Sequence, residues 1–201
     1  MKLILVRHGE TTGNSALRYW GATDLALSGA GLTQAEQLGR RLKSDTFDSA
    51  YCSELTRAIS TAEEITRGRS VDIIKCRELN ELNFGRLEGL SAEEISSGYP
   101  EFYGRWLKWD TDLEFPGGES IKDLKARVAG FTERLSSNGP VDTVLIVAHA
   151  GTLRMLICHL MGLPLSYWRK LRLDLASVST VDLTPNGAVL TRLNDTAHLV
   201  K

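Results

Sequence analysis

The sequence predicts an α/β fold in three layers, with a β-sheet between two layers of helices. Over most of the chain, short apolar runs of strand length alternate with longer segments that have the periodicity of amphipathic helices. This alternation is typical of domains in which helices cover both faces of one sheet. The 201 residues suit one domain with a substantial core, and the sequence shows no internal repeat or linker.

The first half of the chain contains three predicted strands and two predicted helices. The strands are predicted at residues 2–6, 47–52 and 71–75. Ser28 can cap a helix that runs to about residue 43, with Leu32 among the apolar positions of one face. Ser53 is predicted to cap a second helix over residues 54–67. Residues 77–90 have no clear period and include two glycines, which indicates a functional loop.

Residues 91–119 differ in character, because Trp106 and Trp109 stand among charged residues, glycines and prolines. We expect helical pieces and loops that form a lid above the sheet within the single domain 1–201. Ser120 can cap the next helix, which runs to about residue 136. The remaining predicted elements are a strand at 143–148, helices at 151–161 and 165–171, and a closing hairpin with strands at 177–183 and 188–193.

The composition excludes several classes of protein. A net charge of −1 argues against nucleic-acid or membrane-surface binding, which needs a basic excess. No apolar run approaches the ~20 residues of a membrane span, and the apolar start is too short for a signal peptide. Cys52, Cys76 and Cys158 form no C-x-x-C pattern. An odd number of unpatterned cysteines suits a reducing cytoplasm and offers no metal site, so we expect a cytoplasmic protein.

Polar residues follow three of the predicted strands. Arg7 and His8 end the first strand and Asn14 comes shortly after, Arg57 follows the second strand, and His149 follows the most apolar one. The carboxyl ends of strands in α/β sheets are where ligands bind. Guanidinium groups fit a phosphoryl group, and helix N-termini at this edge would add backbone N–H groups. The sequence therefore predicts a phosphate site.

A histidine is the best candidate for a nucleophile. The sequence has no G-x-S-x-G elbow and no phosphate-binding G-x-x-x-x-G-K-[ST] loop. Cys52 and Arg57 are one residue too close for a cysteine-phosphatase loop, and Asp110 does not follow an apolar strand. We therefore expect His8 to attack phosphorus and form a phosphohistidine. Glu81 is the predicted proton donor, because a neighbouring phosphate favours a protonated carboxyl.

Each of these residues also has a structural interpretation. Arg57 could be a solvated charge, Glu81 a surface carboxylate, His149 a polar cap and Asn14 a turn residue. Their joint occurrence after the right strands favours a site. A domain that only binds phospho-ligands is the non-enzymatic alternative, but binding a phosphate dianion gains nothing from Glu81.

Five segments resemble the motifs of the histidine phosphatase superfamily, which includes the cofactor-dependent phosphoglycerate mutases. They are LVRHGET at residues 5–11, Gly21-x-x-Asp24-x-x-Leu27-x-x-x-Gly31, Cys52-Ser53-Glu54-Leu55-x-Arg57-Ala58-x-x-Thr61-Ala62, Glu81-x-x-Phe84-Gly85-x-x-Glu88-Gly89, and Val147-Ala148-His149-x-Gly151. The resemblance covers residues 2 to about 163. It implies a mixed, mostly parallel sheet with helices on both sides, and chemistry that needs no metal or cofactor. It also implies a phosphorylated His8, an acid/base at Glu81, and phosphate binding by Arg7, His8, Asn14, Gly21, Arg57 and His149.

Within the superfamily the chain is most similar to the α-ribazole phosphatases, through Pro116-Gly117-Gly118-Glu119-Ser120 and through Leu163-Pro164 followed by Trp168. This similarity implies hydrolysis of α-ribazole 5′-phosphate in cobalamin nucleotide-loop assembly. The alternatives are a broad-specificity phosphatase and a phosphoglycerate mutase. Mutase chains are typically longer, so hydrolysis is expected.

Two positions depart from the common pattern, since Ala150 follows the second histidine and Asn83 stands where aspartate is common. The aromatic residues of the lid, with Trp20 opposite, could stack on a benzimidazole base or simply pack together. The expected partner is a small phosphomonoester, without nucleic acid or membrane. The closing hairpin could also offer its edge to a second copy of the chain.

Overall fold

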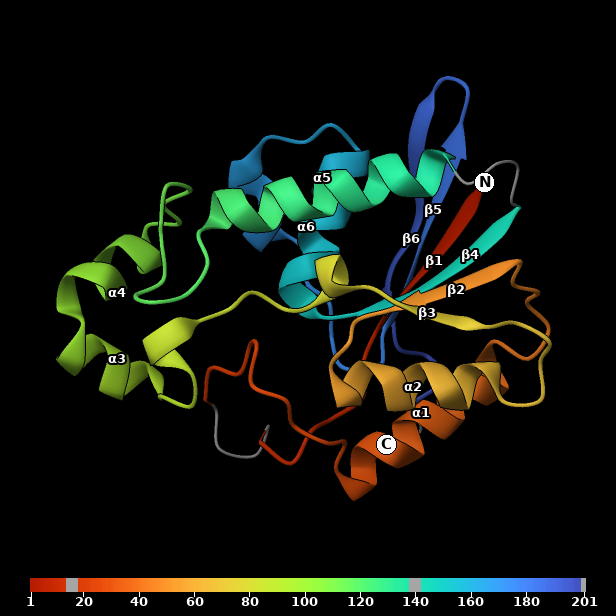
Figure 1. Cartoon of the computed structure of the whole chain (residues 1–201), viewed down its shortest axis with the longest axis horizontal. Coiled ribbons are helices and arrows are strands. Elements are labelled where there is room, and N and C mark those ends of the chain that lie inside the picture. Colours follow the sequence, from red (N-terminus) through yellow and green to blue (C-terminus); the bar gives the residue numbers. More distant parts are fainter. Residues whose placement is uncertain (14–17, 138–141, 200–201) are drawn as a thin grey trace.

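The structure, a computed structural model, describes residues 1–13, 18–137 and 142–199. A mixed sheet runs through its centre, with strand order β3-β2-β4-β1-β5-β6 (Figure 1). The strands are β1 (Lys2–Arg7), β2 (Ser49–Cys52), β3 (Ile73–Lys75), β4 (Thr143–Ala148), β5 (Val178–Thr184) and β6 (Gly187–Asp195). The first four in this order are mutually parallel, and β5 and β6 join them as an antiparallel hairpin. This arrangement confirms the predicted fold class.

The alternation of side chains along β1 places helices on both faces of the sheet. Leu3 and Leu5 join one core cluster, and Ile4 and Val6 join the other. The first cluster includes side chains of α5 (Ile121–Ser137) and α6 (Ala150–Leu160), and the second those of α1 (Gly29–Arg41) and α2 (Thr56–Thr66). Figure 1 shows the sheet between these two pairs of helices. The result is the predicted three-layer build.

The predicted helix caps are confirmed at α1 and α5 and wrong at α2. The hydroxyls of Ser28 and Ser120 each accept a hydrogen bond from the backbone amide three residues later, both at 3.0 Å. The helix α2 begins only at Thr56, and the Asp24 carboxylate accepts from the Thr56 amide at 2.8 Å and hydroxyl at 2.7 Å. The Ser53 side chain points into the interior instead, where it is fully buried.

The prediction that Leu32 belongs to the buried face of α1 is also wrong. Leu32 is 47% exposed, because the buried stripe of the helix runs through Gly31, Ala35 and Leu38. A residue next to this stripe is rotated by about 100° away from it. Leu32 therefore faces outward.

The segment between β3 and α5 is made of short helical pieces. They are the 3₁₀ turns η2 (Arg77–Leu79) and η3 (Gly85–Leu87) and the helices α3 (Ala92–Gly98) and α4 (Pro100–Leu107). The two helices lie at one end of the molecule (Figure 1). Trp106 packs against Phe115 and Trp168, with ring centroids 5.3 and 6.3 Å apart, and its Nε1 donates to the Tyr19 hydroxyl at 3.3 Å. Trp106 is thus packed among other aromatic rings, whereas Trp109 is 40% exposed.

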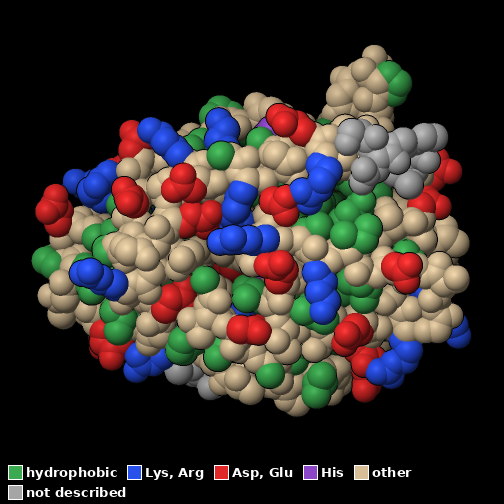
Figure 2. Space-filling model, viewed as in Figure 1, with side chains coloured by type: hydrophobic (Ala, Val, Ile, Leu, Met, Phe, Trp, Pro, Cys, Tyr) green, Lys and Arg blue, Asp and Glu red, His purple; other side chains and the backbone are tan. Residues whose placement is uncertain are grey.

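The predicted helix at 165–171 is a 3₁₀ helix, η4 (Leu165–Lys170). Within the described ranges, no helix is long and apolar enough to cross a membrane. Acidic and basic side chains are interspersed over the face shown in Figure 2, as the small net charge suggests.

Candidate active site

Two histidines meet where β1 and β4 end. The strands are parallel neighbours with Arg7 opposite Ala148, so the residues that follow them, His8 and His149, become adjacent. The His8 amide donates to the Ala148 carbonyl at 3.0 Å, and the two imidazole centroids are 4.9 Å apart. Both side chains are buried. Sheet pairing alone therefore assembles the centre of the site.

The neighbours of His8 determine which of its nitrogens carries the proton. Its Nδ1 lies 2.7 Å from the Gly9 carbonyl, which can only accept, so Nδ1 carries the hydrogen and Nε2 keeps its lone pair. The pKa of His8 lies well below its usual range, mainly because the ring is buried and also because the charged guanidinium groups of Arg7 and Arg57 are nearby. At neutral pH His8 is therefore an uncharged imidazole with a free Nε2.

His149 has the opposite proton arrangement. The Glu54 amide donates to the Asn80 side-chain oxygen at 2.9 Å, which identifies this atom as an acceptor. The Ser53 hydroxyl lies 2.8 Å from the same oxygen and therefore donates its hydrogen to it. The Ser53 oxygen then accepts from His149 Nε2 at 2.8 Å, while His149 Nδ1 accepts from Arg57 Nε at 3.2 Å. Burial and the Arg57 charge lower the pKa of His149 well below its usual range. Ser53 and Asn80 were not predicted to belong to the site.

Arg57 is held by the loop that precedes α1. Its guanidinium donates to the carbonyls of Gly21 at 2.6 Å and Thr23 at 2.8 Å. The Glu88 carboxylate holds this loop in turn, accepting from the amides of Gly21 at 3.0 Å and Ala22 at 2.9 Å. Gly21 was predicted to bind phosphate, but here its amide is engaged by Glu88 and its carbonyl positions Arg57. Glu88 lies in a segment that carries the family resemblance, although its sequence alone indicated no role.

Glu81 lies across the cavity at the start of α6. Its Oε2 accepts from the Gly151 amide at 2.9 Å, and its Oε1 accepts from the amides of Leu82 at 2.9 Å and Thr152 at 3.2 Å. A Cβ on Gly151 would come within 2.5 Å of Glu81 Oε1, so this close approach requires glycine. The amides of Gly151 and Thr152, the second and third residues of α6, therefore hold Glu81 and not a phosphate. At α2, Asp24 occupies the equivalent position.

Arg7 completes the cationic wall. Its Nη1 donates to the Leu173 carbonyl at 2.7 Å, while its Nε is buried and has no hydrogen-bond partner among the described residues. Burial lowers the pKa of Arg7 to about 10, so the group remains charged at neutral pH. One edge of this guanidinium is thus anchored.

A cavity of about 120 Å³ lies between these groups. Of the predicted residues, Arg7, His8, Arg57 and Glu81 line it, and His149 lies beside His8. Asn14 lies outside the described residues. The other lining residues, of which only Trp20 was anticipated near the site, are Thr11, Arg18, Trp20 and Leu25.

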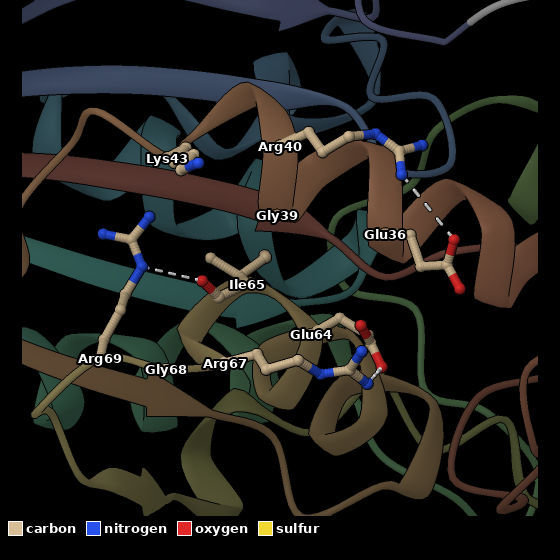
Figure 3. Close-up of a pocket in the computed structure, with 9 residues that line it drawn as sticks. All are labelled: Glu36, Gly39, Arg40, Lys43, Glu64, Ile65, Arg67, Gly68 and Arg69. Atoms are coloured by element: carbon tan, nitrogen blue, oxygen red, sulfur yellow. Dashed lines mark hydrogen bonds and ion pairs between the residues drawn. The ribbon is translucent and has the colours of Figure 1, made fainter.

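A larger hollow of about 560 Å³ lies elsewhere, between α1 and α2 (Figure 3). Most of its charged side chains are already engaged, since Arg40 pairs with Glu36, Arg67 pairs with Glu64, and Arg69 donates to the Ile65 carbonyl. It contains no histidine, cysteine or serine. The smaller cavity therefore has the better claim to chemistry.

The alternative nucleophile Cys52 is unsuited to attack, because burial raises the pKa of its thiol to about 12. In the part of the chain that the structure describes, no three His, Cys, Asp or Glu side chains are grouped so as to hold a metal ion. The histidine and the carboxylate that line the cavity thus remain as its reactive groups.

Comparisons with known proteins agree with this geometry. Residues 3–196 match the family model described as histidine phosphatase superfamily (branch 1). The chain is 36% identical to phosphoserine phosphatase 1 of Hydrogenobacter thermophilus, over 99% of this chain and 94% of that protein. It is 34% identical to the adenosylcobalamin/alpha-ribazole phosphatase of Escherichia coli K12, over 98% and 97%.

A solved structure shares the whole fold. The alpha-ribazole phosphatase of Shigella flexneri superposes with a TM-score of 0.92 at 33% sequence identity, and all of both chains is covered. The likeness therefore includes the segments on both sides of the cavity. The chain belongs to branch 1 of the histidine phosphatase superfamily and is a phosphatase of that family.

Proposed function

We propose that the chain is a phosphomonoesterase that works through a phosphohistidine at His8. The observation that carries this proposal is the neutral His8, whose proton is held on Nδ1 while Nε2 is free in a cavity lined by Arg7 and Arg57. Glu81, a carboxyl that can donate and accept a proton, lines the same cavity. A site that only bound phosphate would gain nothing from that carboxylate.

In the first step the Nε2 lone pair attacks phosphorus and the bond from phosphorus to the ester oxygen breaks. Protonated Glu81 gives its proton to the leaving oxygen, so an alcohol departs. Arg7 and Arg57 stabilise the charge on the equatorial oxygens. In the second step Glu81 accepts a proton from water, the resulting oxygen attacks phosphorus, and the P–N bond breaks to release phosphate and free His8.

The Ser53–His149 contact supports a positioning role for this second histidine. The Ser53 oxygen accepts a hydrogen bond from His149 Nε2, so Nδ1 of the same ring keeps its lone pair. This lone pair accepts from Arg57 Nε and orients the Arg57 side chain. Arg57 is thus fixed from two directions, by His149 and by the carbonyls of Gly21 and Thr23. A fixed guanidinium loses little entropy when it binds the phosphoryl group.

Two substrates are proposed as alternatives. Similarity to the alpha-ribazole phosphatases supports α-ribazole 5′-phosphate. Similarity to phosphoserine phosphatase 1 supports O-phosphoserine as the other candidate. We also propose that residues 91–119 act as a lid within one domain, and that the protein works in the cytoplasm.

Trapping the intermediate tests the proposal. The wild type, incubated briefly with a ³²P-labelled phosphomonoester and quenched, should carry one acid-labile, base-stable phosphoryl group, and His8→Gln should carry none. His159→Gln is the matched control, since His159 is exposed on α6 and bonds Thr132. Turnover of α-ribazole 5′-phosphate and O-phosphoserine by His8→Gln at the wild-type rate would disprove the mechanism.

A further inference from the structure

Arg154 stands on the face of α6 that meets Glu81. The Gly151 amide on this face donates to Glu81, and Arg154 follows it by three residues, which places both on one side of the helix. Side chains on a helix lean toward its N-terminus, so the Arg154 side chain covers the turn that contains Gly151. It therefore extends toward the proton donor.

Arg154 has no fixed partner. Across residues 1–13, 18–137 and 142–199 it makes no hydrogen bond or ion pair, and its Nε is buried without a partner. Neighbouring guanidinium groups are held, since Arg18 donates to the Gly89 carbonyl at 2.6 Å and Arg169 lies 4.0 Å over the Trp106 ring. Arg154 is thus the charged group beside the site that is left to interact with a ligand.

The charges around Arg154 do not neutralise it by direct contact. Burial lowers the pKa of Arg154, and Glu81 and Asp174 oppose this effect without forming an ion pair with it. The Asp174 carboxylate is engaged by Arg172 at 2.8 Å and by the Asn194 amide at 3.0 Å. A half-buried cation without a direct partner is costly, and an anion placed against it offsets that cost.

We propose that Arg154 binds a carboxylate on the leaving group of the substrate, which makes phosphomonoesters of small hydroxy acids the preferred substrates. The inference rests on the proposed function, in which Glu81 faces the leaving oxygen and so marks the leaving-group side. The phosphoryl group itself lies with His8, Arg7 and Arg57, in a cavity that Arg154 does not line. Arg154 is therefore a specificity residue.

Paired substrates test this role. O-Phosphoserine and O-phosphoethanolamine differ only in the carboxylate, and the wild type should have the higher kcat/KM for O-phosphoserine. In Arg154→Gln the ratio of the two kcat/KM values should fall by about 10- to 100-fold, and Arg154→Lys should restore part of it. Arg40→Gln, on the distant helix α1, is the matched control and should leave the ratio unchanged.

The outcomes separate this inference from the proposed function. Equal losses on both substrates in Arg154→Gln would mean that Arg154 acts through Glu81 or the phosphate, and would overturn the inference. A wild type that prefers α-ribazole 5′-phosphate to every carboxylate ester would also overturn it. Failure of the wild type to hydrolyse any phosphomonoester or to form the phosphoenzyme would overturn the proposed function instead.

Discussion

The protons on the two histidines are set by their neighbours, and this gives the histidines different tasks. His8 donates to a carbonyl through Nδ1 and keeps Nε2 for attack, whereas His149 donates to Ser53 through Nε2 and accepts from Arg57. The two rings are in contact and equally uncharged. Hydrogen bonds, rather than charge, distinguish the nucleophile from its neighbour.

Removal of the Ser53 hydroxyl tests this assignment. Ser53→Ala leaves the buried His149 N–H without its partner and removes one of the two hydrogen bonds that the Asn80 oxygen accepts, which should cost about 1–3 kcal/mol of stability and lower kcat/KM about tenfold. Ser177→Ala is the matched control, because the Ser177 hydroxyl is equally buried but has no hydrogen-bond partner among the described residues. Chemical denaturation and steady-state kinetics measure both effects. Equal behaviour of the two variants would contradict the role of Ser53.

Leaving-group dependence tests the role of Glu81. Glu81→Gln cannot supply a proton, so turnover of an alkyl phosphomonoester should fall by about 10²- to 10⁴-fold. With p-nitrophenyl phosphate, whose leaving group needs little protonation, the loss should be much smaller. Glu78→Gln is the control, since Glu78 pairs with Arg134 away from the cavity. Identical losses on both substrates would exclude Glu81 as the proton donor.

Most residues of the site could be predicted from the sequence. Each of them either follows a predicted strand or belongs to a motif that resembles the histidine phosphatase superfamily. Arg7, His8, Arg57 and Glu81 do line one cavity. The residues that hold them could not be predicted, because their partners are far away along the chain. Glu88, for example, reaches amides 65–67 residues earlier in the sequence.

At the scale of elements, the start of α2 shows where local rules lose to tertiary contacts. Ser53 has a good capping side chain, yet the structure uses it for His149. The cap comes from Asp24, 32 residues away, which also fixes the loop that carries the carbonyls around Arg57. One carboxylate thus ties the start of a helix to the phosphate site.

Loss of this carboxylate should have two measurable consequences. Asp24→Ala should cost about 1 kcal/mol of stability, as the loss of a cap usually does, and should also weaken inhibition by inorganic phosphate because the loop around Arg57 loosens. Ser120→Ala removes the cap of α5 at a similar cost but far from Arg57, so its phosphate Ki should match the wild type. Unaltered phosphate inhibition in Asp24→Ala would show that the cap is only structural.

At the scale of the whole molecule, the buried neutral histidines couple stability to pH. The unfolded chain binds protons on these imidazoles below about pH 6.5, whereas the folded protein does not, because both pKa values are lowered. Stability is therefore full above pH 6.5 and falls as the solution becomes more acidic. Each histidine contributes at most about 1.4 kcal/mol per pH unit in that window.

Urea unfolding at pH 7 and pH 5 measures this coupling. The free energy of unfolding of the wild type should fall between these pH values by up to about 4 kcal/mol more than that of the double variant His8→Gln/His149→Gln. His198, whose pKa is also lowered, is present in both proteins and cancels in the difference. Parallel losses in the two proteins would mean that these histidines are protonated in the folded state.

Hydrophobic periodicity predicted the strands and the main helices, since burial on one or two faces leaves a direct trace in the sequence. The strand order left no such trace. Nothing in residues 2–7 indicates that they lie between β4 and β5, because a short apolar run predicts a buried strand but not the strands with which it pairs. The path of residues 77–119 was equally hidden, since aromatic packing rather than periodicity determines it.

The central place of β1 has a consequence for biosynthesis. The strand that carries Arg7 is made well before its sheet neighbours, which are residues 143–148 and 178–184. During translation β1 has no sheet partner until most of the chain has left the ribosome, and its four apolar residues stay exposed for that time. Catalytic competence thus arrives late in synthesis, and a ribosome-bound nascent chain that ends before residue 143 cannot place His8 beside His149.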